Sequence, residues 1–169
     1  MALNATDLRQ WAADQVDMAP HIATLTKLAR KCQTIVEFGV RGGVSTWALL
    51  DGLSETGRLY SVDIIDCDVP PRVSDDPRWT FIVGNDTDPA VQRQLPDRAD
   101  LVFIDTSHEY EHTCVELAFA QTLIPARIVL HDYVMADVLR AGTEFCEREG
   151  WRVIANEMPY GLATLVPMP

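Results

Sequence analysis

The stretch TIVEFGVRGGVSTWALLDGL, residues 34–53, decides how the chain folds. It begins with a short apolar, β-branched run over 34–39, passes through a glycine-bearing loop, and continues as an apolar helical pattern over 44–53. A strand followed at once by a helix is the first half of a βαβ unit, whose strands are covered by helices on both faces. This stretch therefore predicts the start of a parallel sheet.

The same alternation continues along the chain. Further strands are predicted at 58–64, 79–84, 100–105 and 127–132, with crossover helices at 44–53, 88–95 and 109–123. A helix is predicted over 135–149, and the runs 151–158 and 161–167 are joined too briefly for a crossover, so they form an antiparallel hairpin. The predicted fold class is α/β: a Rossmann-like, doubly wound, seven-stranded, mostly parallel sheet with a C-terminal antiparallel hairpin.

The segment before the sheet is predicted to be helical. Apolar positions at helical spacing predict helices over 5–16 and 20–31. The chain has 169 residues and contains no repeat, low-complexity stretch or long linker. We therefore expect one domain, 1–169, with N-terminal helices in 1–33 and a cofactor-binding core in 34–169.

Composition narrows the class of function. The 14 basic and 25 acidic residues give a formal charge of −11, and no Lys/Arg cluster is present, so a nucleic-acid surface is excluded and a small-molecule substrate is expected. The N-terminus lacks a secretion signal and no apolar run approaches the ~20 residues of a membrane helix, so we expect a cytoplasmic protein that does not associate with membranes. The four cysteines are scattered, without C-x-x-C spacing, and are interpreted as reduced thiols.

The loop that follows the first strand predicts a cofactor site. Gly39 and Gly43 let the backbone approach a ligand closely, and the free N–H groups at the start of the next helix favour an anionic group. Asp63 ends the second predicted strand, where its carboxylate can accept hydrogen bonds from two ribose hydroxyls. We therefore expect a nucleoside-carrying cofactor that lies across the strand ends.

The glycine spacing distinguishes between cofactors. A dinucleotide fingerprint requires G-x-G-x-x-G, whereas this loop has G-x-x-G-G, which disfavours NAD. The pattern E-x-G-x-x-x-G, formed by Glu37, Gly39 and Gly43, resembles motif I of class I methyltransferases, which bind S-adenosylmethionine (SAM). Asp63 stands at the position of that family's ribose-binding acid. An NAD-dependent oxidoreductase stays as a less favoured alternative.

Later segments resemble the same family, in the same order. Residues 84–88, Gly-Asn-Asp-Thr-Asp, follow the third strand, where the family contacts adenine. The segments LVFIDTSHEYEH (101–112), RIVLHDY (127–133) and YGLATLVP (160–167) resemble a group of small-molecule O-methyltransferases. This group is related to cephalosporin hydroxylase-like and macrolide or sugar O-methyltransferases, and more distantly to catechol O-methyltransferase. The resemblance covers residues 30–167.

The resemblance implies SAM-dependent methyl transfer, most naturally to an oxygen of a small molecule. It assigns the methionine and ribose parts of SAM to the first two strand ends, and the adenine to Asp86 with support from Thr87. The residues expected to bind the cofactor are Glu37, Gly39, Val40, Gly43, Ser45, Asp63, Ile64, Asp86 and Thr87.

Methyl transfer to a hydroxyl requires a base or a metal ion beside the methyl group. Related metal-dependent O-methyltransferases place Mg²⁺ ligands at the positions of Asp105, His131 and Asp132, but imidazole is a poor ligand for Mg²⁺. Two alternatives stay open: these three residues bind a divalent ion, Mg²⁺ or a softer one, or His108 or His131 is the general base of a metal-free site. The predicted catalytic residues are Asp105, His108 and His131.

Two other functions compete with this hypothesis. His108 to His112 matches the zinc-peptidase signature H-E-x-x-H, but His108 precedes the expected helix, so the two imidazoles would not share a helix face. The main alternative is a non-catalytic SAM-binding, nucleotide-binding or interaction module with the same fold, because little chain is left to wall a substrate pocket. A homodimer partner could complete that pocket.

Overall fold

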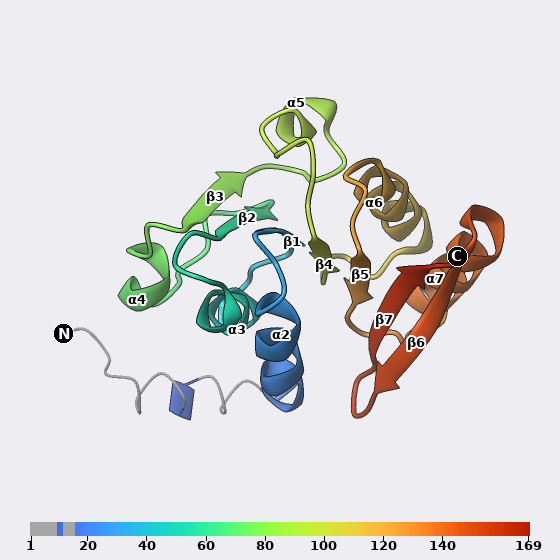
Figure 1. Ribbon diagram of the computed structural model, residues 1–169, viewed down its shortest axis with the longest axis horizontal. Helices are drawn as coiled ribbons and strands as arrows, with labels where there is room; N and C mark the ends of the chain where they lie inside the picture. Colours follow the sequence, from blue (N-terminus) through green and yellow to red (C-terminus); the bar gives the residue numbers. More distant parts are fainter. Residues whose placement is uncertain (1–9, 12–15) are drawn as a thin grey trace.

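Seven strands form one sheet at the centre of the computed structural model, which describes residues 10–11 and 16–169 (Figure 1). The order across the sheet is β3-β2-β1-β4-β5-β7-β6. The first five strands pair in parallel, and β7 pairs antiparallel with both β5 and β6. The strands are β1 (Thr34–Phe38), β2 (Arg58–Asp63), β3 (Trp79–Val83), β4 (Leu101–Ile104), β5 (Arg127–Leu130), β6 (Trp151–Glu157) and β7 (Leu162–Pro167). The predicted fold class is confirmed.

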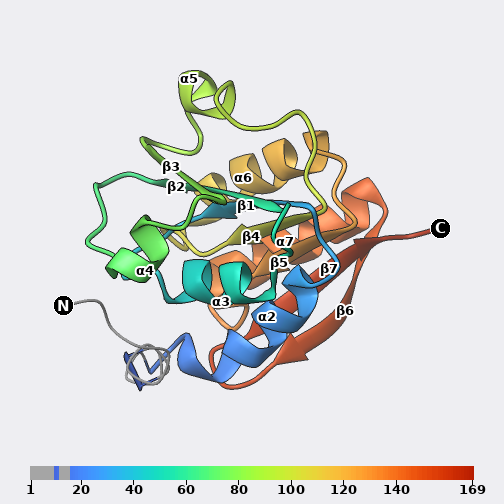
Figure 2. The ribbon, with the colours of Figure 1, turned by 60° about the vertical axis from the view of Figure 1, so that its left-hand side comes forward.

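Helices cover both faces of this sheet (Figures 1 and 2). The helices are η1 (Ala19–His21), α2 (Ile22–Ala29), α3 (Val44–Gly52), α4 (Pro71–Ser74), α5 (Pro89–Gln92), α6 (Tyr110–Thr122) and α7 (Ala136–Glu149). One face packs against α2 and α3, and the other against α6 and α7. None of the helices in the described part of the chain is long and apolar enough to cross a membrane.

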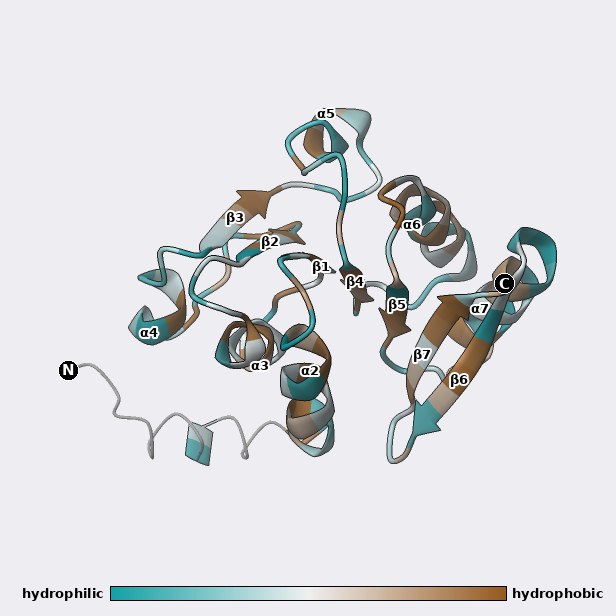
Figure 3. Cartoon of the chain, in the orientation of Figure 1, coloured by the Kyte–Doolittle hydropathy of each residue, from teal (hydrophilic) through white to brown (hydrophobic). Residues whose placement is uncertain are grey.

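Alternate residues of the central strands supply the two cores. In β1, Val36 and Phe38 pack toward α6 and α7, whereas Ile35 packs toward α2 and α3. In β4, Val102 and Phe103 divide between the two cores in the same way. Because both faces of the sheet are covered, odd-numbered and even-numbered positions of a central strand must both be apolar. Figure 3 shows β4 and β5 as mostly hydrophobic. This is why the strands appear in the sequence as continuous apolar runs.

The topology places the carboxyl ends of the parallel strands at one edge of the sheet. β1 pairs with β2 on one side and with β4 on the other, so the order of the strands reverses direction between β1 and β4. Open α/β sheets bind ligands in the crevice at such a switch point. The segments that follow β1 and β4 are therefore expected to form the site.

Several predicted helices differ from the observed ones. The helix predicted over 88–95 is only α5, because the chain beyond Gln92 continues with turn-type bonds from Gln94 to Val91 and from Leu95 to Gln92. The helix predicted over 20–31 is divided into η1 and α2, and α4 was not predicted. The helix predicted over 5–16 lies almost entirely outside the described residues.

Candidate active site

A pocket of about 340 Å³ opens at the carboxyl ends of the first four strands. A hollow of about 20 Å³ adjoins it, shares Arg41 and Asp105 with it, and is also lined by Val40 and Ser45. The pocket is lined by Gly39, Arg41, Asp63, Ile64, Gly84, Asn85, Asp86, Asp105, Thr106, Ser107 and His112. Five of the predicted site residues thus line one pocket: Gly39, Asp63, Ile64, Asp86 and Asp105.

The loop after β1 requires glycine for reasons internal to the fold. Gly39 has a φ of +87°, and a Cβ on it would lie 1.8 Å from the main-chain oxygen of Asp105. Gly43 has a φ of +78° and lies before the first residue of α3, where an added Cβ would meet Val69 at 2.8 Å. Gly39 therefore joins the first and fourth strand ends, whereas Gly43 shapes the start of α3 without lining the pocket.

Asp63 fixes the shape of the same loop. Its Oδ2 accepts hydrogen bonds from the backbone N–H groups of Val40 at 2.8 Å and Arg41 at 3.0 Å, and its Oδ1 accepts one from Ile65 at 3.2 Å. Burial opposes the charge, but these amides outweigh it and lower the pKa of the Asp63 carboxyl. Asp63 is therefore an ionised carboxylate at the wall of the pocket, and the loop is held to it.

Glu37 lies beneath the loop and not in the pocket. Its side chain is fully buried and accepts hydrogen bonds from the hydroxyls of Ser45 at 2.6 Å, Thr46 at 2.8 Å and Ser61. Burial raises the pKa of Glu37 to about 7, although the three hydroxyls offset part of that effect. The strand that carries Glu37 is covered on both faces, so the structure replaces the expected cofactor contact of Glu37 with a supporting role.

The turn after β3 carries the two predicted adenine contacts, Asp86 and Thr87, but only one of them faces the pocket. Asp86 is buried on the pocket wall, with its Oδ1 at 2.8 Å from Nε2 of His112. Thr87 instead directs its amide and its hydroxyl to Oδ1 of Asn85, at 3.0 and 2.7 Å. Asp86 therefore faces the pocket, while Thr87 stabilises the turn.

The ends of β4 and β5 bring together Asp105, His108, His131 and Asp132, which we call the acid–histidine cluster. Nε2 of His108 lies 3.2 Å from Asp105 and 3.1 Å from Asp132. Nδ1 of His131 lies 3.0 Å from Asp132 and 3.4 Å from Asp105. His108 and Asp132 have positive φ values of 60° and 52°, a strained backbone conformation that is common at functional sites. All four predicted catalytic and metal-binding residues therefore form one group.

Charge pairing dominates this cluster. Burial opposes the ionisation of Asp105, but hydrogen bonds from His108 and His131 lower its pKa well below the usual range. Burial likewise opposes the charge on His131, but Asp105 and Asp132 raise its pKa to about 9. The hydrogen bond to Asp105 raises the pKa of His108. Without another cation, the two carboxylates therefore favour the protonated form of both imidazoles, most strongly that of His131.

The donor atoms of this cluster fit a divalent metal ion. Carboxylate oxygens of Asp105 and Asp132 and a ring nitrogen of His131 lie within 4.8 Å of one another. Nε2 of His131 is buried and has no hydrogen-bond partner among the described residues. A mixed oxygen and nitrogen set suits ions softer than Mg²⁺.

The H-E-x-x-H segment does not form a peptidase site. α6 begins at Tyr110, so His108 precedes the helix and its imidazole belongs to the acid–histidine cluster. The imidazole of His112 points instead to Asp86 and Glu116. The two imidazoles therefore belong to different clusters, as expected from the position of the preceding strand.

Sequence reasoning missed several residues of the pocket. The missed lining residues are Arg41, Gly84, Asn85, Thr106, Ser107 and His112. Gly84 is the last residue of a predicted strand, and four others lie within two residues after one, so including each strand end and the residues just after it would have found these five. His112 lies on a helix, and no local signal placed it beside Asp86.

The strand order, the antiparallel β7 and the pocket at the switch point together define a Rossmann-like class I methyltransferase fold. Residues 36–133, more than half of the chain, match the model of a family described as "Methyltransferase domain". The chain therefore belongs to this methyltransferase family, which confirms the family and fold expected from its sequence. A search of curated proteins found no match.

Solved structures of methyltransferases share the fold. The O-methyltransferase from Bacillus cereus, in complex with SAH, superposes with a TM-score of 0.69 and 17% identity over 95% of this chain and 90% of that one. The O-methyltransferase TomG from Streptomyces achromogenes, in complex with SAM, superposes with a TM-score of 0.74 and 18% identity over 99% of this chain and 92% of that one. A methyltransferase from Geobacter sulfurreducens superposes with a TM-score of 0.73 and 16% identity over 99% of this chain and 91% of that one. At these identities the likeness establishes the fold.

Proposed function

We propose that this protein transfers the methyl group of SAM to an oxygen atom of a small molecule, with a divalent metal ion at the acid–histidine cluster. The observation that carries the proposal is the convergence of Asp63, Asp86 and Asp105 on one pocket. At about 340 Å³, that pocket falls in the range of about 300–1,000 Å³ that is usual for small-molecule sites.

The pocket offers a partner for each part of SAM. Asp63 is ionised and lies where two ribose hydroxyls can donate to it, and Asp86 can accept a hydrogen bond from the adenine amine. Arg41 borders both the pocket and the small hollow, and it is the one arginine or lysine among the described residues that line them. The carboxylate of the methionine part can replace Asp17, which now pairs with Arg41 at 2.7 Å.

Asp105 connects the cofactor to the acceptor. Its side chain lines the pocket and also belongs to the acid–histidine cluster, so an acceptor hydroxyl held at the cluster lies beside the methyl group. In-line displacement requires this proximity. When bound, a divalent ion polarises the acceptor oxygen and favours loss of its proton.

The charge state of the histidines favours metal assistance over a metal-free base. A general base must be neutral, but Asp105 and Asp132 raise the pKa of His131 to about 9, and the hydrogen bond to Asp105 also raises the pKa of His108. A divalent ion on the same carboxylates would replace those protons. His131 would then be a ligand, and His108 would orient the two carboxylates.

Two measurements test the proposal. Calorimetry with SAH should give a dissociation constant in the micromolar range, and absence of heat at high protein concentration would contradict cofactor binding. Turnover of SAM should then be assayed against catechols, phenols and sugars, with metal-stripped protein and after addition of Mg²⁺, Mn²⁺ or Co²⁺. SAH binding without turnover of any acceptor would favour the non-catalytic module.

A further inference from the structure

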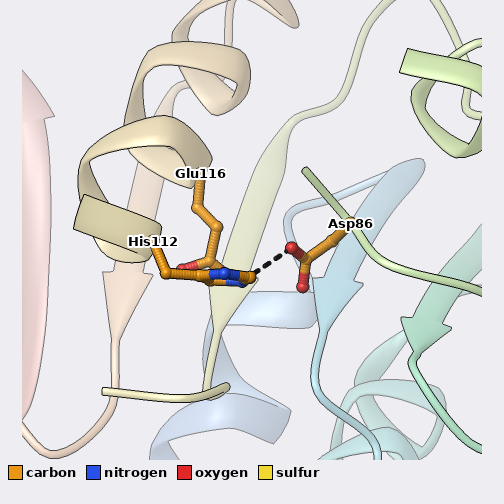
Figure 4. A group of neighbouring side chains, drawn as sticks. All are labelled: Asp86, His112 and Glu116. Carbon is orange, nitrogen blue, oxygen red and sulfur yellow. Dashed lines mark ion pairs between the residues drawn. The ribbon is translucent and has the colours of Figure 1, made fainter. Parts of the chain in front are cut away.

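Asp86, His112 and Glu116 form a second group of potential metal ligands, which we call the His112 cluster. His112 and Glu116 are four residues apart in α6, so their side chains share one face of the helix. Asp86 comes from the turn after β3. Figure 4 shows the side chains of His112 and Glu116 converging beside the helix, with the imidazole of His112 facing Asp86 from the neighbouring segment.

The cluster is compact, and its two carboxylates are buried while His112 is partly exposed at the pocket. Nε2 of His112 lies 2.8 Å from Oδ1 of Asp86 and 3.7 Å from Oε1 of Glu116. The side chain of Glu116 is 0% exposed and that of Asp86 is 9% exposed. One ligand atom from each residue lies within 4.8 Å of the other two. Two acidic groups and one imidazole are thus enclosed together.

Three polar atoms of this cluster lack hydrogen-bond partners. Oδ1 of Asp86, Nε2 of His112 and Oε2 of Glu116 are buried, and none makes a hydrogen bond of acceptable geometry within the described part of the chain. The 2.8 Å approach between Asp86 and His112 is close enough for a hydrogen bond but is not aligned as one. Buried polar atoms are almost always paired, so three in one place indicate an ion or an ordered water between them.

The charge of the cluster also requires compensation. Burial raises the pKa of Glu116 well above its usual range, and the neighbouring Asp86 carboxyl raises it further. Burial likewise raises the pKa of Asp86, although His112 offsets part of that effect. A divalent cation between the two carboxylates would remove both penalties.

Outer contacts hold the carboxylate of Glu116 and the turn that carries Asp86. The hydroxyl of Thr106 donates to Oε1 of Glu116 at 2.8 Å, which leaves Oε2 free. The side-chain amide of Gln92 donates to the main-chain oxygen of Asp86 at 2.9 Å. Such outer-shell hydrogen bonds orient the ligands of metal sites in proteins.

We propose that Asp86, His112 and Glu116 bind a divalent transition metal ion of borderline softness, represented by Zn²⁺, at a site separate from the acid–histidine cluster. Zn²⁺ accepts one imidazole and two carboxylates, whereas Mg²⁺ prefers oxygen ligands alone. Ligand atoms around a tetrahedral Zn²⁺ lie ~3.4 Å apart, given its bond lengths. Nε2 of His112 lies 2.8 Å from Oδ1 of Asp86, below that value, and 3.7 Å from Oε1 of Glu116, whose Oε2 is the unpartnered oxygen. Asp86 and His112 line the pocket, so the fourth coordination position faces it.

Direct metal binding tests the proposal without any methyl transfer, so its outcome does not depend on the proposed function. Metal-stripped, full-length protein is titrated with Zn²⁺ by calorimetry and with Co²⁺ by visible absorption. His112→Ala removes the imidazole, and Glu116→Gln keeps the shape of the side chain but removes its charge. His131→Ala is the matched control, because it removes the corresponding imidazole of the acid–histidine cluster.

We expect the affinity for one of the bound Zn²⁺ ions to fall about tenfold or more in His112→Ala and in Glu116→Gln. The same ion should bind with unchanged affinity in His131→Ala. Zn²⁺ should also raise the Tm of the wild-type protein and of His131→Ala, and it should raise that of His112→Ala by less, because His112→Ala keeps only the acid–histidine cluster. Unchanged stoichiometry and affinity in His112→Ala would overturn the proposal, as would absence of Zn²⁺ binding to the wild type. Circular dichroism checks that Glu116→Gln folds. If it does not, the result for His112→Ala tests the proposal by itself, because the His112 side chain is 23% exposed and its loss leaves the core intact.

Discussion

The α-carbon of Gly39 lies so close to the main-chain oxygen of Asp105 that a Cβ on Gly39 would be 1.8 Å from that oxygen. This contact joins the loop after β1 to the end of β4, at the point where the order of the strands reverses. Backbone of the proposed cofactor loop, which Asp63 also holds, is therefore packed directly against backbone that leads into the acid–histidine cluster. The side chains on either side can act together only while this contact persists.

Replacement of Gly39 by alanine should therefore be severely destabilising. The added methyl group overlaps backbone, and the φ of +87° is itself unfavourable for alanine. We expect a loss of about 3–5 kcal/mol in the free energy of unfolding, measured with urea. Gly42→Ala is the control in the same loop, because its added Cβ meets nothing within 4 Å, and it should change stability by less than ~1 kcal/mol. Equal effects of the two substitutions would refute this account.

The buried carboxyl of Glu37 should make stability depend on pH. Its pKa rises on folding from 4.5 to about 7, so the folded state binds the proton more tightly. The contribution of this group is present below pH 4.5 and is lost as the pH rises through about 7. Glu37→Gln does not titrate, so its stability relative to the wild type should increase by ~2.5 kcal/mol between pH 5 and pH 8. Urea unfolding at four pH values measures this, and parallel profiles for the two proteins would contradict it.

The sequence predicts the fold well because the central strands β1, β4 and β5 are buried on both faces. Runs such as 34–39 and 127–132 are apolar at consecutive positions, and the topology then brings their ends to one edge. Residues at the carboxyl end of a strand, such as Asp63 and Asp105, are therefore predicted to share one pocket, and both line it. In a parallel sheet, a residue at the carboxyl end of any strand lies at the same edge, so its place in the sequence predicts that it is near the site.

Other features depend on contacts that no local pattern encodes. Motif spacing marked Glu37, but its burial depends on hydroxyls supplied by α3 and β2. The hydroxyl of Thr87 donates a hydrogen bond to the side chain of Asn85, two residues earlier. This contact depends on the geometry of the turn and not on the motif. The His112 cluster joins α6 to the turn after β3, so the sequence could show the spacing of His112 and Glu116 but not the approach of Asp86.

Asp63 should control cofactor affinity. Asp63→Asn removes the charge that accepts the ribose hydroxyls and weakens the bonds to the loop amides of Val40 and Arg41. We expect SAH to bind at least about tenfold more weakly, the usual scale for loss of a hydrogen bond to a charged group. Asp66→Asn is the control, because it makes the same change at an exposed position three residues away. An equal loss in both variants would mean that only the net charge matters.

Asp132 should separate catalysis from cofactor binding. It belongs to the acid–histidine cluster but does not line the cofactor pocket among the described residues. Asp132→Asn should lower kcat by about a hundredfold or more, because a metal ligand is lost, while the Kd for SAH changes less than about threefold. Chelation of the wild type should have the same effect, and Mn²⁺ or Co²⁺ should reverse it. Full activity in the presence of a chelator would remove the metal from the mechanism.

Zn²⁺ at the His112 cluster should compete with the cofactor. The proposed ion takes Oδ1 of Asp86, the side chain that is also the proposed acceptor for the adenine amine. In the His131→Ala background, saturating Zn²⁺ should raise the apparent Kd for SAH by about fivefold or more, which corresponds to a coupling free energy of about 1 kcal/mol. The double variant His112→Ala/His131→Ala should show no such effect. If Zn²⁺ binds and the Kd for SAH stays constant, Asp86 serves the metal and not the adenine, and the adenine must lie along another part of the pocket wall, nearer to Ile64 and Asn85.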